Sequence, residues 1–445
     1  MSTYTYSRRR FLQSAALAGA GLALGACGGG AGSGKGGTLK YWNQFFPTSS
    51  TTDKSLKRDD FWVVQSAKRF SEAHGITVEV SDLPGDDSAF TKFRTAGVAR
   101  NGPDVASLWS GSYTFGLKNY IEPLDSYLDN GYRSTLTGWD VGTEGLVAEK
   151  GTIYGVPPGN DGIAAVYFDS RVLDRAGAKV SEDTVLEWDE WLDVLRKIKA
   201  TGVTPLALGN GDYTLFSLFY WIAQVTGGET GLRDLGDGTR KFNDSALQAV
   251  VRQWLQLVPY TLASPSTMDD PIGQIAAGKA STVIQGPWAI SDLRNVLGDD
   301  VLMTRLPNIN ATAPVRDSGI GGPGGDLVVT KYSKQKDEAV AFIKHLTSKA
   351  EQLDRIKNHP HEDIKFPNLA GLDLASLFTD SLLVRQAEWV NQKFVFYADN
   401  IWPTDLVNEI YAQAQLIWAG KKTPEAFLSA LDDKRDSIVK NGGNK

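Results

Sequence analysis

Hydrophobic positions along the chain recur with two spacings, every second residue and every third or fourth, and these spacings predict strands and helices in alternation. Short strands are predicted at residues 38–41 and 105–109, and residues 76–80 alternate strictly between polar and apolar side chains. Helical spacing runs through residues 59–74 and 88–100, between those strands. This order, with short links, predicts an α/β domain with a largely parallel sheet.

The same alternation starts again after the Pro- and Gly-rich segment at residues 155–159. The later predicted strands are 163–168, 205–208, 280–285 and 326–330, and the later helices are 187–199, 245–258, 333–348, 404–419 and one that begins at Thr423-Pro424. A threonine N-cap followed by proline is a strong helix start. Two such patterns in 445 residues predict two domains, with room for a third.

The composition excludes several classes of protein. With 42 % hydrophobic and 22 % charged residues, the chain is typical of a globular protein. A net charge of −6 and the lack of any block of five or six Lys and Arg residues remove the electrostatic basis for binding nucleic acid. A single cysteine excludes internal disulfides, and four histidines leave little material for a metal site. We therefore expect no metal, no cofactor and no nucleic-acid partner.

The N-terminus resembles an export signal followed by a lipid-attachment site. Ser7-Arg8-Arg9-Arg10-Phe11-Leu12 resembles the core of a twin-arginine signal, and the apolar run at residues 15–26 is too short to span a membrane. Leu24-Gly25-Ala26-Cys27 resembles a lipobox, which is cut before its cysteine. We predict a signal peptide at 1–26, lipidation of Cys27 and a flexible tether at 27–37. The body would lie at the outer face of the cytoplasmic membrane, touching it only through this anchor.

Common catalytic motifs are missing from the sequence. It contains no functional P-loop, no dinucleotide-binding fingerprint, no nucleophile elbow, no H-E-x-x-H and no C-x-x-C. His359-Pro360-His361 with Glu362 and Asp363 comes nearest to a metal cluster, but its proline and polar neighbours indicate a surface loop. Paired aspartates at 86–87, 269–270, 299–300 and 432–433 are typical of solvated turns. We therefore expect a protein that is not an enzyme.

Aromatic residues are frequent where the predicted strands end or in loops. In α/β folds, ligands bind beyond the carboxyl ends of strands, and aromatic rings there suit the C–H faces of sugars. Structural packing is the alternative for every one of these side chains. They are Trp42, Trp109, Tyr113, Tyr213, Trp288 and Trp402.

From about residue 38 to residue 439, an ordered set of segments resembles the extracellular solute-binding proteins of carbohydrate ABC importers, the group that includes maltose-binding protein. The segments are Gly155-Val156-Pro157 with Val166-Tyr167-Phe168-Asp169, the helix start Glu187-Trp188-Asp189-Glu190-Trp191, Ala276–Ala280 running to Gly286-Pro287-Trp288-Ala289, and Gly322–Gly325 leading into Asp326-Leu327-Val328-Val329. Each segment alone is weak, but their order and spacing together are specific.

The resemblance implies an α/β fold with two lobes, of the type II periplasmic-binding-protein kind, with a hinge and an interlobe cleft. The N-terminal lobe would hold residues 38–150 and 312–350, and the C-terminal lobe residues 155–305 and 351–440. By motif position, Trp288 resembles a sugar-stacking tryptophan and Trp402 a second aromatic platform. The other implied ligand-binding residues are Trp42, Asn43, Asp86, Trp109, Asp161, Asn210, Asp212, Tyr213, Gly322 and Gly324.

The implied function is capture of a di- or oligosaccharide by hinge closure and its delivery to the permease subunits of an ABC transporter, by a protein we expect to be a monomer. Two alternatives stay open, a secreted glycoside hydrolase or lyase and a binding protein for a non-sugar polar solute. Xylo-, cello-, malto- and amino-sugar oligomers all remain candidates for the sugar.

Overall fold

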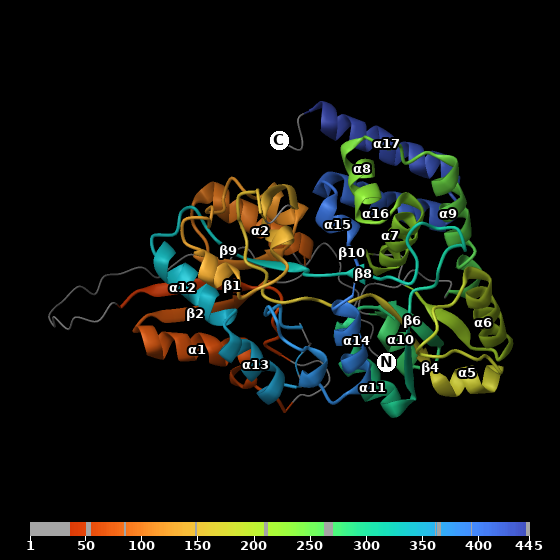
Figure 1. The fold of residues 1–445 in the computed structure, drawn as a ribbon, viewed down its shortest axis with the longest axis horizontal. Coiled ribbons are helices and arrows are strands. Elements are labelled where there is room, and N and C mark those ends of the chain that lie inside the picture. The colour runs from red at the N-terminus through yellow and green to blue at the C-terminus, as the bar shows by residue number, and fades with distance from the viewer. Residues whose placement is uncertain are drawn as a thin grey trace, which may run out of the picture. The chain divides into compact units, whose positions relative to one another are not determined.

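A computed structural model describes residues 36–49, 55–83, 86–146, 149–208, 212–261, 270–360, 362, 366–392 and 394–441, without the side chains of 86–88, 212–216 and 270. The predicted signal peptide, Cys27 and most of the predicted tether lie outside the described residues. Residues Gly37–Lys445 form one compact unit, and this unit contains two separate four-stranded sheets with helices packed around each (Figure 1).

The first sheet has the strand order β2-β1-β3-β9 and belongs to the N-terminal lobe. Its strands are β1 (Thr38–Asn43), β2 (Thr77–Asp82), β3 (Val105–Trp109) and β9 (Gly325–Val329). The helices of this lobe are α1 (Trp62–His74), α2 (Asp86–Ala99), α3 (Ser112–Gly116), α4 (Asn130–Arg133), α12 (Lys336–Leu346) and α13 (Lys349–Asn358), with 3-10 turns at Arg58–Asp60, Trp139–Gly142 and Glu144–Leu146. β1 pairs in parallel with β2 and β3, whereas β9 runs antiparallel to β3.

The second sheet has the order β5-β6-β4-β7 and belongs to the C-terminal lobe. Its strands are β4 (Ala165–Asp169), β5 (Thr204–Ala207), β6 (Ala280–Gln285) and β7 (Val301–Arg305). The helices here are α5 (Ser170–Ala176), α6 (Trp188–Ala200), α7 (Asp212–Thr226), α8 (Glu229–Asp237), α9 (Ser245–Leu255), α10 (Asp270–Ala276), α11 (Ile290–Leu297), α14 (Ser381–Val390), α15 (Ala398–Ile401), α16 (Thr404–Trp418) and α17 (Pro424–Lys440), with 3-10 turns at Val258–Tyr260, Pro287–Ala289, Gly298–Asp300 and Ala375–Leu377.

The α/β fold class is confirmed, and most predicted elements lie within a few residues of their predicted positions. Strands 105–109 and 280–285 have the predicted bounds. Helix α1 ends at Gly75 with φ +65°, the left-handed conformation that glycine adopts without strain. A largely parallel sheet was predicted for the first domain, and the second sheet is mixed, because β4 runs antiparallel to both β6 and β7 while β5 and β6 are parallel.

Several segments cross between the two sheets. Ile163 bridges Gly321, and Val156 bridges Leu327, so the first crossover lies beside the segment that leads back into β9. The short strands β8 (Ile320–Gly321) and β10 (Val395–Phe396) add a parallel pair between the lobes, visible near the middle of Figure 1. The lobes are thus joined by several extended strands, the kind of connection that permits hinge motion.

Each lobe has its own hydrophobic core. In the N-terminal lobe, Tyr41, Phe70 and Phe342 form edge-to-face pairs on one side of the sheet. In the C-terminal lobe, Trp188 and Trp221 pack edge to face at 4.9 Å between ring centroids. Burying one such aromatic side chain contributes about 2–3 kcal/mol.

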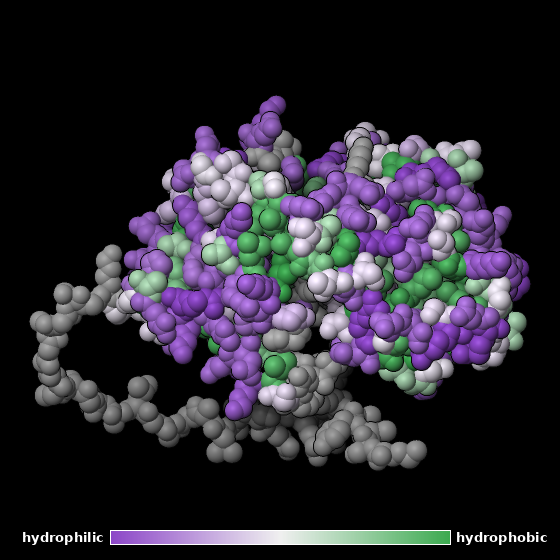
Figure 2. Space-filling view, turned by 60° about the horizontal axis from the view of Figure 1, so that its bottom comes forward, coloured by the Kyte–Doolittle hydropathy of each residue, from purple (hydrophilic) through white to green (hydrophobic). Residues whose placement is uncertain are grey.

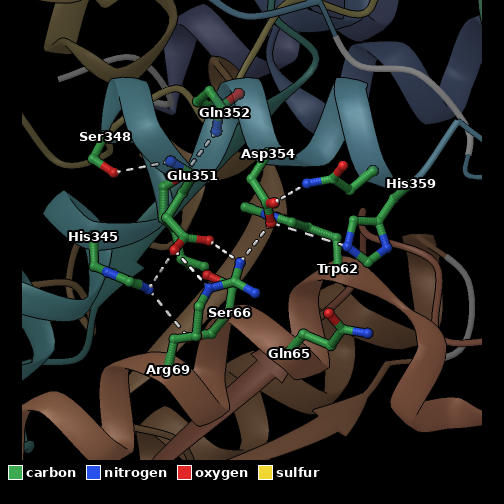
Figure 3. A network of polar contacts seen from close by, with 12 residues as sticks. Trp62, Gln65, Ser66, Arg69, His345, Ser348, Glu351, Gln352, Asp354 and His359 are labelled. Carbon is green, nitrogen blue, oxygen red and sulfur yellow. Dashed lines mark hydrogen bonds and ion pairs between the residues drawn. The ribbon is translucent and has the colours of Figure 1, made fainter.

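Helix α13 belongs to the N-terminal lobe, although the predicted boundary assigned residues from 351 onward to the other lobe. Arg69 on α1 donates to Glu351 on α13 at 2.9 Å from Nε, and its Nη2 contacts both Glu351 and Asp354 (Figure 3). Burial opposes ionisation of Glu351, but the bonds from Arg69 and Ser66 outweigh it and lower the pKa of that carboxyl. The ion-paired carboxylate therefore fastens α13 to α1.

Candidate functional site

A pocket of about 290 Å³ lies between the two lobes. One wall comes from the C-terminal lobe, from the turn after β6, α11 and the start of α14, and the other comes from α13 and the residues that follow it. On the face shown in Figure 2, hydrophobic residues gather near the middle and again on the right-hand part, with hydrophilic residues around both areas. The volume is close to the lower end of the range of small-molecule sites, and the polar and aromatic lining suits a polar ligand.

Trp288 gives the C-terminal wall its aromatic surface. It lies in the 3-10 turn that directly follows β6, and its indole nitrogen donates to Gln285 Oε1 at 3.1 Å. The ring folds back over Gly286, where a Cβ would lie 2.1 Å from it. Glycine at 286 is therefore required for this ring position. The half-buried indole lines the pocket with its remaining surface.

An ion pair stands on the same wall. Arg294 on α11 donates from Nε to Asp380 Oδ2 at 2.8 Å. Asp380 also caps α14, because its other oxygen accepts from the Leu382 amide at 2.8 Å. Side-chain exposures of 22 % and 29 % show that both partners keep contact with solvent. The charges on this wall are thus paired and partly screened.

The polar side chains of the N-terminal wall are Arg355, His359 and Glu362, and they are more deeply buried than those of the other wall. The side chains of His359 and Glu362 are only 5 % and 1 % exposed. Glu362 Oε1 accepts from the Trp62 amide at 2.5 Å and lies 3.4 Å from His359 Nδ1. His359 Nδ1 also lies 3.1 Å from the Asp60 carbonyl oxygen. These contacts attach the wall to the segment where α1 begins.

Arg355 is a buried cation in this wall. Its guanidinium lies 5.5 Å from the ring centroids of both Phe46 and Trp62, within range of cation–π attraction. Burial lowers the pKa of Arg355 to about 10, and the negative charges of Glu362 and Asp161 oppose that shift. The side chain is therefore positively charged at neutral pH.

Asp161 and Trp109 form a second polar and aromatic group, next to the first crossover. Asp161 is 5 % exposed, and its amide donates to the Gly322 carbonyl at 3.0 Å. A Cβ on Gly324 would lie 1.8 Å from Asp161 Oδ2 and 3.3 Å from the Trp109 ring. Trp109 in turn packs against Phe45, with 6.0 Å between ring centroids. Glycine at 324 thus permits an approach between the end of β3 and the crossover.

A family model described as "Bacterial extracellular solute-binding protein" matches residues 65–359, more than half of the chain. The chain belongs to this family. The family is one of solute-binding proteins rather than of enzymes.

Two curated proteins are similar to parts of this solute-binding protein. The lactose-binding protein of Rhizobium radiobacter is 26 % identical over 209 residues, which cover 46 % of this chain and 47 % of the relative. A probable sugar-binding periplasmic protein of Mesorhizobium japonicum is 24 % identical over 248 residues, covering 51 % of this chain and 55 % of the relative. The matches thus span about half the length of these relatives.

Solved structures resemble the fold over nearly the whole chain. A chitin oligosaccharide binding protein superposes with a TM-score of 0.75 and 20 % identity, over 91 % of this chain and 99 % of the other. The GacH receptor of Streptomyces glaucescens, described without ligand and with acarbose, gives a TM-score of 0.71 and 22 % identity over the same shares. At these identities the likeness establishes the two-lobe periplasmic-binding-protein-like fold, as predicted.

Trp42 and Asn43 at the end of β1, which were predicted to line the cleft, make contacts with neighbouring residues of the N-terminal lobe. Trp42 packs on the α2 side of the first sheet, with Lys92 Nζ 4.6 Å from its ring centroid. Asn43 is 2 % exposed, and its amide group donates to the Phe46 carbonyl at 2.7 Å and accepts from the Phe46 amide at 3.1 Å. Asn43 therefore shapes the turn that leads to Phe45 and Phe46.

Trp402 is a core residue, and the prediction that it offers an aromatic platform is wrong. Its side chain is fully buried, its indole nitrogen donates to the Leu232 carbonyl at 2.7 Å, and Phe219 and Phe242 pack edge to face against the ring. A ring enclosed in this way has no surface for stacking on a ligand. The sequence of the segment before α16 gives no signal that distinguishes a tryptophan facing a cleft from one packed in a core.

Of the remaining predicted ligand-binding residues, the structure describes only some. Gly322 has φ +114°, and a Cβ there would lie 2.8 Å from Phe396, so this glycine serves the packing of the crossover. Asn210 and the side chains of Asp86, Asp212 and Tyr213 lie outside the described residues. For them the ligand-binding role stays a prediction.

The sequence analysis missed the N-terminal wall of the pocket. It interpreted residues 359–363 as a surface loop, but His359 and Glu362 are buried and line the pocket, so that interpretation is wrong for both of them. His361 and Asp363 lie outside the described residues. Among the residues that are described, no group of three or more His, Cys, Asp or Glu side chains is arranged to hold a metal ion. The described helices also include none that is both long and apolar enough to cross a bilayer.

Proposed function

We propose that this protein is the ligand-capturing component of an ABC importer and that its ligand is a sugar, a di- or oligosaccharide. The observation that carries the proposal is the half-buried indole of Trp288 in a pocket between two lobes, facing a wall of polar groups. Stacking on the indole suits a C–H face of a sugar ring, and charged side chains suit hydrogen bonds with its hydroxyl groups. The names of the sugar-binding relatives support the same ligand class.

Binding would be coupled to hinge closure. The two walls of the pocket belong to different lobes, which several extended segments connect. A ligand that contacts both walls stabilises the arrangement in which both contacts exist together. Permease subunits would distinguish that closed form from the open one, and no chemical step is required of the protein.

We also propose that the protein acts at the outer face of the cytoplasmic membrane, as a monomer held by lipid on Cys27. The support is the lipobox-like sequence around this cysteine, the only one in the chain. Metabolic labelling with a fatty acid should mark the wild-type chain in its host, and Cys27→Ser should lose the label and be released from membranes. Label that persists in Cys27→Ser would contradict lipidation at this position.

Calorimetric titration of the Cys27→Ser chain against xylo-, cello-, malto- and chito-oligosaccharides tests the proposed ligand class. We expect a dissociation constant in the micromolar range or tighter for one series, together with a change in tryptophan fluorescence. If the folded protein binds none of these sugars, the ligand class would be a different polar solute. Turnover of a sugar would instead indicate a carbohydrate-active enzyme.

A further inference from the structure

Asp326 carries a fully buried carboxyl group outside the interlobe pocket. It is the second residue of β9, its side chain is 0 % exposed, and neither carboxyl oxygen has a hydrogen-bond partner among the described residues. The Thr114 hydroxyl, which acts on this carboxyl, donates instead to the Trp109 carbonyl at 3.0 Å. The Gly111 amide likewise donates to the Val141 carbonyl at 2.8 Å. A carboxylate without donors is costly in a site closed to solvent, so the neutral acid is favoured there.

One side of this carboxyl packs against the backbone of the first crossover. A Cβ on Gly155, at the start of the crossover, would lie 2.5 Å from Asp326 Cγ, and a Cβ on Gly142 would lie 2.9 Å from Asp326 Oδ1. The next residue of β9, Leu327, exchanges backbone hydrogen bonds with Val156 at 2.8 and 3.0 Å. The carboxyl is therefore packed against the strand on which the lobes would turn, and a change in the path of that strand changes its surroundings.

The start of α3, on another side of Asp326, is hydrogen-bonded to α15 of the C-terminal lobe. The Ser112 hydroxyl donates to the Asp399 carbonyl at 2.7 Å, and Asn400 Nδ2 donates to Ser110 Oγ at 2.5 Å. Two connections between the lobes, the first crossover and the α3–α15 contact, thus meet around Asp326. We expect a rotation of the lobes to displace at least one of them and to open the carboxyl to water.

We propose that capture of the sugar is coupled to the uptake of one proton by Asp326: the arrangement that holds the sugar keeps this carboxyl dry and protonated, and separation of the lobes hydrates it and releases the proton. This inference rests on the proposed sugar-binding function. The proton comes from the solvent and returns to it. Burial raises the pKa of Asp326 to about 8, whereas a hydrated aspartate has a pKa of about 4, so the two arrangements differ in protonation between these values.

Other titratable side chains lie on the elements around Asp326. They are Tyr113 on α3, Asp140 in the 3-10 turn that ends at Gly142, and Tyr154 before the crossover. The pKa of Asp326 is shifted by burial and by the two uncharged groups named above. Burial also raises the pKa of Tyr154, so this phenol stays neutral between about pH 4 and pH 8. The expected proton uptake in that range is therefore assigned to Asp326.

The test measures proton uptake by calorimetry in buffers of different ionisation enthalpy at about pH 6.5, using the oligosaccharide from the panel that binds most tightly. The unsubstituted chain should take up between about half a proton and one proton more per sugar than Asp326→Asn, which has no proton to exchange. His359 and Glu362 line the pocket and can exchange protons themselves, but both chains contain them, so the difference isolates Asp326. From about pH 6 to pH 8, affinity should fall by up to about tenfold per pH unit relative to the variant.

Asp292→Asn is the matched control. Burial also raises the pKa of Asp292, but this aspartate lies on α11 of the C-terminal lobe and not at the crossover. Its replacement should leave both the proton uptake and the pH dependence of affinity as they are in the unsubstituted chain. An equal loss of uptake in both variants would contradict the assignment to Asp326.

The outcomes separate this inference from the proposed function. Sugar binding with equal proton uptake in the unsubstituted chain and Asp326→Asn, or with release of a proton, would overturn the coupling and leave the function intact. If Asp326→Asn does not fold by circular dichroism, the unsubstituted chain decides alone, and uptake below about half a proton at pH 7.5 overturns the coupling. Absence of sugar binding by the unsubstituted chain would overturn the function and this inference with it.

Discussion

The two walls of the interlobe pocket are built in different ways. The C-terminal wall follows directly from one strand, because Trp288 lies in the turn after β6 and α11 begins immediately after that turn. The N-terminal wall is assembled from distant segments, since Glu362 accepts from the amide of Trp62, 300 residues earlier. The first wall is aromatic with a partly solvated ion pair, and the second is charged and buried.

This difference suggests a division of roles. An exposed aromatic face contributes contact area to a sugar at little conformational cost. Buried charges contribute directional hydrogen bonds, but only when every charge has its partner. Substitutions on the C-terminal wall should therefore change ligand affinity more than stability, whereas those on the N-terminal wall should change both affinity and stability.

Trp288→Ala should have the largest effect on binding. Removal of the indole takes away the stacking surface of the C-terminal wall, and we expect sugar affinity to fall by about 100-fold or more while the melting temperature changes little. Calorimetry and a thermal melt measure the two quantities. Trp402→Phe is the matched control, because it alters a core tryptophan and should lower the melting temperature without changing affinity. Equal effects of both variants on affinity would contradict the assignment of Trp288.

Asp326→Asn tests a buried carboxyl group of the N-terminal lobe that takes up a proton on folding. Burial raises the pKa of Asp326 to about 8, and contacts with the Thr114 hydroxyl and the Gly111 amide offset this only in part. Between its unfolded pKa and about pH 8 the folded state binds a proton that the unfolded state does not, so wild-type stability declines as the pH rises through this window.

The asparagine variant has no such proton. Its stability relative to the wild type should therefore rise by up to about 1.4 kcal/mol per pH unit until about pH 8 and then level off. Urea unfolding at several pH values measures the difference. A difference that stays constant with pH would mean that Asp326 is ionised in the folded protein.

Glu362→Gln should weaken binding by about ten- to 100-fold and also destabilise the fold. The substitution removes a negative charge beside buried Arg355, and a buried charge that loses its partner is costly. Asp380→Asn is the counterpart on the C-terminal wall, where Arg294 keeps contact with solvent, and it should have a smaller effect on both quantities. A larger loss of affinity and stability in Asp380→Asn than in Glu362→Gln would contradict the proposed difference between the walls.

Arg69→Gln should lower the free energy of unfolding by about 1–2 kcal/mol and affect sugar affinity only a few-fold. Arg69 fastens α13, but its side chain is 37 % exposed, so solvent screens part of the interaction. The pKa of Glu351 is lowered in the fold, so this stabilisation is present at neutral pH and is lost as the pH falls through that lowered value. Urea denaturation at about pH 7 and about pH 4 should show the variant's deficit shrinking in acid.

Much of the fold could be predicted because its elements have local signals. The capping box of Glu187 and Glu190 begins α6, and Thr423 before Pro424 begins α17, as the sequence analysis expected for both helix starts. The mixed direction of the second sheet could not be predicted, because pairing depends on which strands meet rather than on the pattern within one strand. Trp288 was predicted from the recognisable Gly-Pro-Trp turn, and it lines the pocket. Arg355, His359 and Glu362 also line the pocket, but they belong to no motif that the sequence analysis could use.

The sequence by itself determined most of the strands, several of the helices, the family to which the chain belongs and the turn that carries Trp288, because periodicity, capping and turn chemistry act between near neighbours. Only the tertiary structure decided which tryptophans lie in a core and which line a pocket. It alone also showed that the charged side chain of Arg355 on α13 lines the interlobe pocket. The burial of Trp402 and Glu362 depends on Phe219, Phe242 and Trp62, which are remote in sequence. Side-chain environment is set by contacts between distant segments, and those contacts exist only once the chain has folded.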